Sequence, residues 1–247
     1  MKTRLVYGAL AAAYFLSWGL FTGVGVVLNV LCLPLLLLPC RESLGPFVRG
    51  LIRGLFRLWL RWFQMTRCLR ITWLGFGKPF EGRTIYVANH PTLLDATFLL
   101  ARLPDTICII KPRLMRSPAV GPMALLGEYV AGEAGIDLIR NVAMKIAAGR
   151  SLLLFPEGTR TQPGIALGTL KPGFALIAER AHADVQLIVI RASAGLVPRG
   201  RPWWRPPPVL PAHAEFTLDQ RWPYDPARRT RDLTAEVERR LSEVLAG

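Results

Sequence analysis

The sequence predicts an α/β protein, with a single domain built on a largely parallel mixed sheet flanked by helices, preceded by a hydrophobic segment. After residue 66, short β-branched runs alternate with stretches of helical periodicity, a pattern typical of buried strands between helices. From Leu5 to Cys40 there is no charged side chain, whereas the rest of the 247-residue chain has an ordinary globular composition. We therefore divide the chain into residues 1–40, 41–66 and 67–247.

The first part, 1–40, is expected to be embedded in a membrane. As one straight helix its uncharged stretch would measure ~54 Å, well beyond the ~30 Å hydrocarbon core of a bilayer. Glycines near its middle favour a break around Phe21–Val26. Basic residues flank both ends, which favours placing both on the cytoplasmic side. These observations predict a re-entrant hairpin, with a single tilted spanning helix as the alternative.

Residues 41–66 are expected to form a basic amphipathic helix at the membrane interface. Arginine recurs at every fourth position of this stretch, with apolar residues between, at Arg49, Arg53, Arg57 and Arg61. Such a helix can turn its arginines toward anionic lipid headgroups. Alternatively, it is a surface helix whose apolar side packs on the following domain, and both arrangements can hold together.

The balance of charge points to an anionic partner. The net charge is +14, from 31 Lys+Arg against 17 Asp+Glu. No nucleic-acid-binding signature accompanies the charge, so we expect an anionic membrane leaflet and no nucleic acid. The cysteines lack metal-ligand spacing, and so do the three histidines. We therefore assign no metal and no disulfide.

The third part, 67–247, is expected to alternate between strands and helices. The predicted strands are Leu69–Leu74, Thr84–Ala88, Thr106–Ile110, Ser151–Phe155 and Val185–Ile190. The predicted helices are Thr92–Leu103, Ile136–Ala148, Gly173–Ala183 and Pro226–Leu245.

Two polar clusters begin where predicted strands end. The first, Asn89–Asp95, follows Thr84–Ala88, and the second, Pro156–Arg160, follows Ser151–Phe155. In an open α/β sheet, ligands bind in the crevice outside the carboxyl ends of the strands. If the two strands are parallel neighbours, both clusters lie at one edge of the sheet and share one site.

The first cluster supplies a base. A neutral His90 imidazole can take a proton from a hydroxyl, while the Asp95 carboxylate on its other nitrogen fixes the tautomer. We place Asp95 one turn into the following helix, with Thr92 as the N-cap. The alternative is a helix-capping aspartate beside a structural histidine.

The second cluster supplies an anion site. Gly158 lets the backbone approach a ligand, Thr159 offers a hydroxyl, and Arg160 offers a planar guanidinium suited to phosphate. Lys171 adds a positive charge before the next helix, and Glu157 is placed to hold either a glycerol hydroxyl or Arg160. The alternative is a strand-ending turn with a surface arginine.

Together these residues resemble a known family. The stretch from Asn89 to Asp95 resembles the N-H-x-x-x-x-D motif of the glycerolipid acyltransferases, the 1-acylglycerol-3-phosphate O-acyltransferase family. Phe155–Arg160 is similar to its F-P-E-G-T-R block, and Lys171–Gly173 resembles the K-x-G that follows. The two blocks occur in the family's order and spacing, which makes the resemblance specific, and it spans roughly residues 71 to 191.

The resemblance implies a membrane-bound enzyme whose catalytic domain lies on the cytoplasmic face of the membrane. In a bacterium this would be the inner membrane. His90 would be the general base, oriented by Asp95, and the acyl group would pass directly from acyl-CoA or acyl carrier protein to a lysophospholipid hydroxyl. The foremost acceptor is 1-acylglycerol-3-phosphate, giving phosphatidic acid, and no cofactor is implied. The residues expected to bind substrate are Asn89, Glu157, Gly158, Thr159, Arg160 and Lys171.

Other features leave alternatives open. Gly135–Arg140 is a loose match to the family's intermediate motif, and Val185–Ile190 lacks the proline expected in a late strand. Another lyso-lipid acceptor, such as a lyso-ornithine lipid or a lipid of a specialised pathway, therefore remains an alternative. A thioester or lipid hydrolase and a non-catalytic membrane scaffold are the competing classes. Pro198–Pro211, rich in arginine and tryptophan, is either an interfacial lip beside the site or a rigid surface loop.

Overall fold

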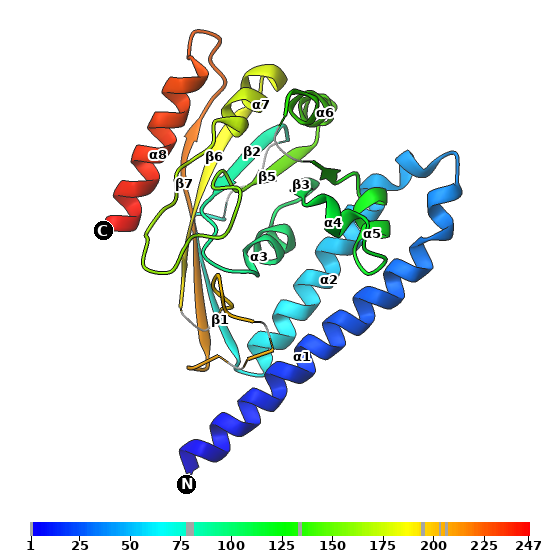
Figure 1. The fold of residues 1–247 in the computed structure, drawn as a ribbon, viewed down its shortest axis with the longest axis vertical. Helices are drawn as coiled ribbons and strands as arrows, with labels where there is room; N and C mark the ends of the chain where they lie inside the picture. The colour runs from blue at the N-terminus through cyan, green and yellow to red at the C-terminus, as the bar shows by residue number, and fades with distance from the viewer. Residues whose placement is uncertain (1, 78–81, 133–134, 194–195, 203, 206) are drawn as a thin grey trace.

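The structure is a computed structural model that describes residues 2–77, 82–132, 135–193, 196–202, 204–205 and 207–247. A seven-stranded sheet lies at its centre, with helices on both faces (Figure 1). The strands are β1 (Leu69–Leu74), β2 (Thr84–Ala88), β3 (Thr106–Ile110), β4 (Val130–Ala131), β5 (Ser151–Leu154), β6 (Asp184–Ala192) and β7 (Ala212–Trp222). The helices are α1 (Lys2–Cys32), α2 (Gly45–Met65), α3 (Asp95–Arg102), α4 (Pro112–Met115), α5 (Gly121–Leu126), α6 (Ile136–Ala147), α7 (Gly173–Ala181) and α8 (Thr230–Ala246).

The sheet is mixed and largely parallel, as predicted. Its order is β1-β7-β6-β2-β5-β3-β4, and the run from β6 to β4 is parallel throughout. β7 pairs antiparallel with β6, and β1 pairs parallel with β7. All five predicted strands are present. The sequence analysis did not predict β4, which is too short to show a pattern. It also did not predict β7, although the alternation of apolar and polar residues at the start of β7 is typical of a strand with one exposed face.

The side chains of the parallel strands divide between two cores because successive residues of a strand point to opposite faces. Tyr86 and Leu153 lie in a core covered by α1, α2 and α3. Ile85 and Leu152 lie in a second core covered by α6, α7 and α8. Both faces of the sheet are therefore buried, which explains why its strands read as nearly continuous apolar runs.

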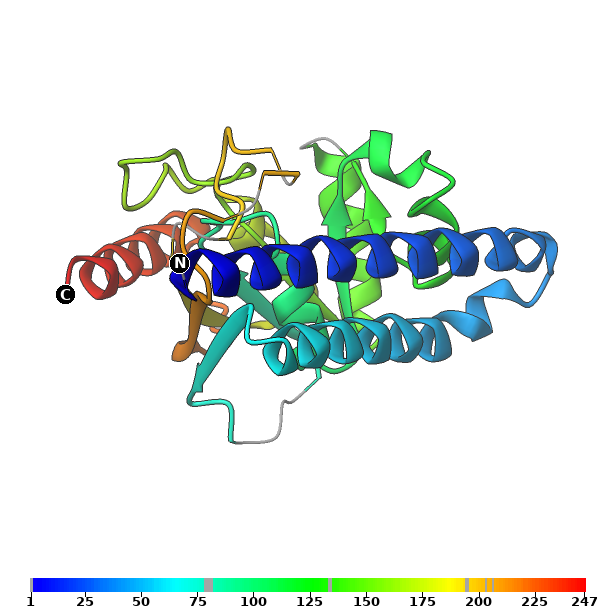
Figure 2. The same ribbon diagram turned by 90° about the horizontal axis from the view of Figure 1, so that it is seen from below.

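The hydrophobic segment forms one uninterrupted helix, so the predicted break near Phe21–Val26 is wrong. A glycine inside a helix costs only ~1 kcal/mol relative to alanine, which the surrounding apolar helix formers outweigh. The hairpin predicted within residues 1–40 is therefore wrong. A different helical hairpin is present, whose turn lies at residues 33–44 and whose arms are α1 and α2, which run side by side (Figures 1 and 2). Among the described residues, Val6–Leu37 is long and apolar enough to cross a membrane.

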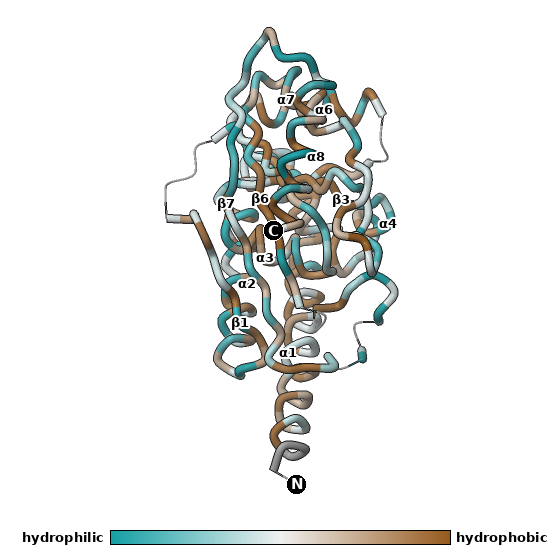
Figure 3. Tube along the Cα trace, turned by 90° about the vertical axis from the view of Figure 1, so that its left-hand side faces the viewer, coloured by the Kyte–Doolittle hydropathy of each residue, from teal (hydrophilic) through white to brown (hydrophobic). Residues whose placement is uncertain are grey.

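Two opposite faces of α1 have different surroundings. One face packs on the domain through Tyr14 and Trp18, which are buried against the Trp59 and Phe63 rings of α2. The other face is apolar but exposed, and comprises Leu16, Leu20, Val24, Val27 and Leu31. The tube in Figure 3 shows the hydrophobic N-terminal end of α1 projecting beyond the rest of the chain. Such an exposed apolar stripe is unusual for a surface in contact with water.

The arginines of α2 face the domain, which corrects the prediction that they point toward lipid headgroups. Arg53 donates to the carbonyl oxygen of Arg102 at 3.0 Å, and Arg57 donates to that of Ala101 at 2.8 Å. Both carbonyls lie at the C-terminal end of α3, where backbone acceptors are unsatisfied and the helix dipole attracts cations. Arg57 stays exposed despite this bond, and Arg61 is exposed as well.

Arg49 makes the strongest link between α2 and the domain. Its buried guanidinium lies 2.6 Å from an Asp105 oxygen and 2.5 Å from a Glu128 oxygen. Arg150 adds two bonds of 2.8 Å to the same Glu128 carboxylate. Burial alone would raise the pKa of Glu128, but the hydrogen bonds from Arg150 and Arg49 outweigh it and hold that pKa below its ordinary value.

Replacing Arg49 should therefore destabilise the fold. We expect Arg49→Met to lower the free energy of unfolding by roughly 1.5–3 kcal/mol, because it removes the charge-assisted bonds from the buried guanidinium to Glu128 and Asp105, while Arg150 keeps its bonds to Glu128. The control Arg61→Met, on the exposed side of the same helix, should change it by less than ~0.5 kcal/mol. Urea unfolding in detergent, followed by circular dichroism, measures both.

The ion pair between Arg49 and Glu128 predicts that the stability of the fold depends on pH. Because the pKa of Glu128 is lowered by folding, its stabilisation is complete above the pKa of an unfolded glutamate, ~4.3. It is lost as the pH falls through the lower folded value. The stability gap between wild type and Arg49→Met should shrink over that acidic range, and a gap independent of pH would contradict the assignment.

Candidate active site

Parallel pairing of β2 with β5 brings the two polar clusters together. Val87 is opposite Leu154, so the same register carries His90 opposite Glu157 beyond the ends of the strands. The two loops are joined there, since the His90 amide donates to a Glu157 oxygen at 3.0 Å and the Thr161 amide donates to the His90 carbonyl at 2.8 Å. The prediction that both clusters lie at one edge of the sheet is confirmed.

His90 and Asp95 form a hydrogen-bonded pair, with the His90 Nδ1 2.8 Å from an Asp95 oxygen. The carboxylate is almost completely buried, whereas 18% of the imidazole side chain is exposed. The His90 ring also stacks on Phe155, with ring centroids 4.1 Å apart. The ring is therefore held from two directions while part of it faces the site.

The start of α3 differs from its prediction. The helix begins at Asp95 itself, after Leu94 at the N-cap, so Asp95 is not one turn inside the helix and Thr92 is not the N-cap. Thr92 instead pairs with Pro198 in a β-bridge, which keeps it extended. Its amide and hydroxyl donate to the Asp95 carboxylate at 2.7 and 2.5 Å.

The electrostatics of the pair suit a base. Burial raises the pKa of Asp95, and the hydrogen bonds from His90 and Thr92 oppose that rise. When Nδ1–H of His90 donates to this carboxylate, the lone pair of the neutral imidazole lies on Nε2. The pair can then accept a proton at Nε2, and the carboxylate stabilises the resulting imidazolium.

Glu157 connects three segments around the site. Besides the His90 amide, its carboxylate accepts from the Thr161 hydroxyl at 2.9 Å and the Gly168 amide at 3.0 Å. The side chain is buried, and these three donors occupy both of its oxygens. These contacts make Glu157 an organiser of the loops. Its contact with a substrate hydroxyl stays a prediction.

Arg160 lies beside the first cluster. Its guanidinium donates to the carbonyl oxygens of Val197 and Pro198, each at 3.2 Å. The same Val197 oxygen also accepts from the Leu93 amide at 3.1 Å. The Val197 carbonyl thus binds both the Arg160 guanidinium and the loop that carries His90. Arg160 is half-buried and partly accessible.

Gly158 and Lys171 are neighbours in space. Gly158 has a φ of +67°, which favours glycine, and a Cβ added there would lie 3.1 Å from the Lys171 ammonium nitrogen. Glycine therefore leaves room for this cation next to the turn. Thr159 is exposed beside it. Lys171 is exposed as well. The anion site predicted from Gly158, Thr159, Arg160 and Lys171 stays a prediction.

Asn89 has a structural contact. Its side-chain amide donates to the Ile190 carbonyl and accepts from the Ile190 amide, both at 2.8 Å. Asn89 thereby extends the pairing of β2 with β6 by one position and fixes where the loop leaves the sheet. Its predicted contact with substrate stays a prediction.

Lys111 is a cation at this edge that the sequence reasoning missed. It directly follows β3, which pairs parallel with β5, and its side chain is exposed. The signal was available, because Lys111 also comes directly after a buried apolar strand. The rule used for the other two clusters was not applied to this strand.

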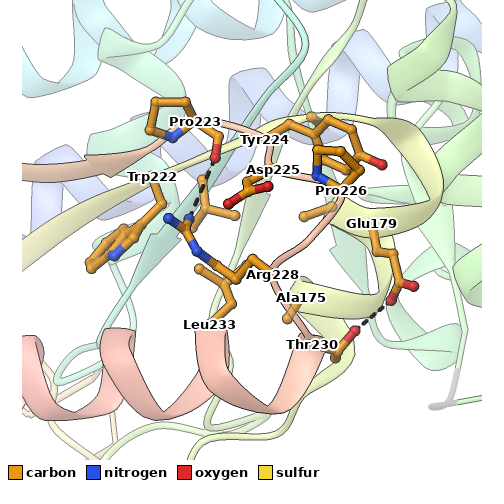
Figure 4. Close-up of a pocket in the computed structure, with 13 residues that line it drawn as sticks. Ala175, Glu179, Trp222, Pro223, Tyr224, Asp225, Pro226, Arg228, Thr230 and Leu233 are labelled. Atoms are coloured by element: carbon orange, nitrogen blue, oxygen red, sulfur yellow. Dashed lines mark hydrogen bonds between the residues drawn. The ribbon is translucent and has the colours of Figure 1, made fainter.

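A cavity of about 70 Å³ lies elsewhere, between α7, the end of β7 and α8 (Figure 4). Trp222, Tyr224 and Arg228 line it, and Arg228 donates to the Pro223 carbonyl across one side. None of the predicted site residues is among its lining residues. A space of this size holds water rather than a lipid, so we do not assign the site there.

Comparisons with known proteins find similar sequences. An acyltransferase family model matches residues 76–193. A 1-acyl-sn-glycerol-3-phosphate acyltransferase of Cocos nucifera is 28% identical over 187 residues, 72% of this chain and 57% of that protein. One of Helicobacter pylori is 31% identical over 115 residues, 44% of this chain and 48% of that protein. The chain thus spans about half the length of these curated relatives.

The fold is also shared with a solved structure. The crystal structure of a 1-acyl-sn-glycerophosphate acyltransferase from Thermotoga maritima superimposes with a TM-score of 0.74 at 20% identity, covering 98% of this chain and 96% of that one. Both polar clusters, including His90, Asp95 and Arg160, fall within the region that the family model matches. From these similarities, residues 76–193 of the chain form a domain that matches the acyltransferase family.

Proposed function

We propose that this protein transfers a fatty acyl group from an acyl thioester to the free hydroxyl of a lysophospholipid, foremost 1-acylglycerol-3-phosphate. One observation carries the proposal: the His90–Asp95 pair opens at the edge of the sheet that also carries Arg160. A proton acceptor beside a phosphate-binding cation suits an acceptor that carries both a hydroxyl and a phosphate.

The proposed reaction needs no acyl-enzyme. Nε2 of His90 takes the proton as the acceptor hydroxyl oxygen attacks the thioester carbonyl carbon. The tetrahedral intermediate then collapses, the carbon–sulfur bond breaks, and the leaving thiolate takes the proton back from the imidazolium. Asp95 remains ionised and stabilises that imidazolium throughout.

The cations at the edge of the sheet are assigned to the acceptor's phosphate. A guanidinium can donate two parallel hydrogen bonds to phosphate, and Arg160 lies against the loop that carries His90. Lys171 lies next to Gly158 and contributes a second charge. The donor, acyl-CoA or acyl carrier protein, carries anionic groups that the basic surface of the chain would attract.

We propose that α1 lies in the plane of one leaflet rather than across the bilayer. Its 31 residues span ~46 Å. Tyr7 near one end donates to the Pro207 carbonyl at 2.6 Å, and Asn29 near the other accepts from the Met123 amide at 3.0 Å. A spanning helix would carry one of these ends away from a domain that stays in water. The exposed apolar stripe of α1 then faces the lipid tails.

Replacing the base should abolish transfer and leave the fold intact. We expect His90→Ala to lower kcat by ~10²–10⁴-fold, and Asp95→Asn to lower it as well, because the ring would lose its fixed tautomer. The control is His213→Ala, at an exposed histidine of β7, which should retain wild-type activity. The measurement is formation of phosphatidic acid from 1-acylglycerol-3-phosphate and acyl-CoA, followed by mass spectrometry.

Two results would count against the proposed function. Turnover by His90→Ala at the wild-type rate would mean that His90 is not the general base. Release of free fatty acid by the wild type, with no new lipid ester, would indicate a hydrolase.

The role of Arg160 is tested by comparing two acceptors. We expect Arg160→Ala to raise KM for 1-acylglycerol-3-phosphate by ~10-fold or more, because a hydrogen bond to a charged group is worth roughly 1.5–3 kcal/mol. KM for the thioester donor and turnover of a monoacylglycerol, which lacks the phosphate, should change little. Arg180→Ala, at an exposed arginine of α7, serves as control. An equal loss with both acceptors would mean that Arg160 shapes the loop and does not bind phosphate.

A further inference from the structure

We propose that the described residues of the stretch 198–211, namely 198–202, 204–205 and 207–211, here called the proline-rich loop, form a second membrane-docking element that binds the surface of an anionic bilayer. This role goes beyond the proposed acyl transfer and is separate from the contact that α1 makes with lipid tails. Four observations carry it: the anchorage of the loop, its charge, its exposed apolar side chains and its stiffness.

The proline-rich loop connects the active site to α1. At its start, Pro198 pairs with Thr92 and accepts a hydrogen bond from Arg160. Further along, the Pro207 carbonyl accepts from the Tyr7 hydroxyl near the N-terminal end of α1. Figures 1 and 2 show the loop next to that end of the helix. A bilayer that contacts the exposed face of α1 therefore lies close to this loop as well.

All charged residues of the proline-rich loop are positive. Arg199 and Arg205 are exposed, and Arg201 lies between them in the sequence. There is no aspartate or glutamate anywhere between Asp184 and Glu215. An arginine close to an anionic bilayer contributes ~1 kcal/mol to binding, so several on one loop give a strong preference for acidic lipids.

Large apolar side chains are exposed among these arginines. Trp204 is 62% exposed and Val209 is 67% exposed. Tryptophan is the residue that most favours the level of lipid headgroups, where its ring meets acyl chains and its N–H stays hydrated. An exposed tryptophan flanked by arginines fits the headgroup layer better than it fits water. The continuity of this loop with the apolar face of α1 favours a bilayer over a nucleic acid as the occupant.

The stiffness of the proline-rich loop lowers the entropic cost of its docking to a bilayer. Prolines occupy many positions of the loop, and each fixes its own φ. Pro207 is buried, so the middle of the loop is also attached to the protein. A loop held in one conformation loses little conformational entropy when it meets a surface.

Vesicle flotation tests the inference without requiring activity. The variants are the double substitution Arg199→Glu/Arg205→Glu and the single substitution Trp204→Ala. The matched control is Arg231→Glu/Arg239→Glu, which makes the same change in net charge on α8, at exposed positions that lie on the opposite side of the sheet from α1 (Figure 1). The probes are vesicles of phosphatidylcholine with and without phosphatidylglycerol.

The loop double variant should lose ~10-fold or more of the preference for phosphatidylglycerol vesicles, while the control keeps most of it. At ~1 M salt the difference should disappear, because charges are then screened within ~3 Å. Trp204→Ala should weaken binding to both kinds of vesicle. An equal loss in the loop and control variants would overturn the inference, because net charge alone would then account for membrane binding. No loss in the loop variant would overturn it as well, because its arginines would then make no contact with the bilayer.

A second measurement separates this inference from the proposed function. In neutral detergent micelles, where no anionic surface exists, the double variant should transfer acyl groups with wild-type kcat. Loss of kcat there would mean that the loop serves the reaction itself and would overturn a docking role. Should the wild type form no lipid ester in micelles, the proposed function fails, while vesicle flotation still decides the role of the loop.

Discussion

The site depends on one buried carboxylate. Glu157 receives the His90 amide, the Thr161 hydroxyl and the Gly168 amide, and so joins the ends of two parallel strands to a third segment. A buried carboxylate without such donors would be costly, so each loop position is favoured only when the others are in place. This constraint explains why a glutamate occupies the start of the second cluster. Glu157 thereby positions the loops that carry His90 and Arg160, and in the proposed mechanism it does not touch the transferred proton.

The His90–Asp95 pair depends in turn on the sheet. Asn89 fixes the end of β2 against β6, and Thr92 gives both of its polar groups to Asp95. These bonds offset part of the effect of burial, which raises the pKa of Asp95, and they keep the carboxylate aimed at the imidazole. Residues on either side of the histidine therefore hold it in place, which is why the chemistry is carried by a contiguous stretch of sequence.

Much of this arrangement could be read from the sequence, because it follows from local rules. β1, β2 and β3 begin and end where their apolar runs predicted, and the rule that ligands bind at the carboxyl ends of parallel strands located both polar clusters. Lys111 was missed because that rule was applied to two strands and not to the third. The start of α3 was misplaced because Thr92 has a partner, Pro198, that lies more than a hundred residues away.

The less predictable parts depend on partners that are distant in the chain. A repeating arginine on a helix indicates a polar face, but it does not say whether that face meets lipid or protein. In α2, Arg53 and Arg57 find the carbonyls at the end of α3, and Arg49 finds Asp105 and Glu128. These partners bind the arginines within the protein, and on the proposed arrangement the lipid-facing role passes to the apolar face of α1.

That division of roles explains how the site can meet a membrane lipid. On the proposed arrangement, α1 lies within the leaflet and the proline-rich loop lies at the level of the headgroups, between α1 and the loop that carries His90. The reacting hydroxyl and the phosphate of a lysophospholipid both belong to the headgroup region. The acceptor could then reach His90 and Arg160 while its acyl chain stays among lipid tails, so the enzyme would not have to extract that chain into water, at ~0.8 kcal/mol for each methylene. A site at this level therefore makes a deep water-filled pocket unnecessary for the acceptor.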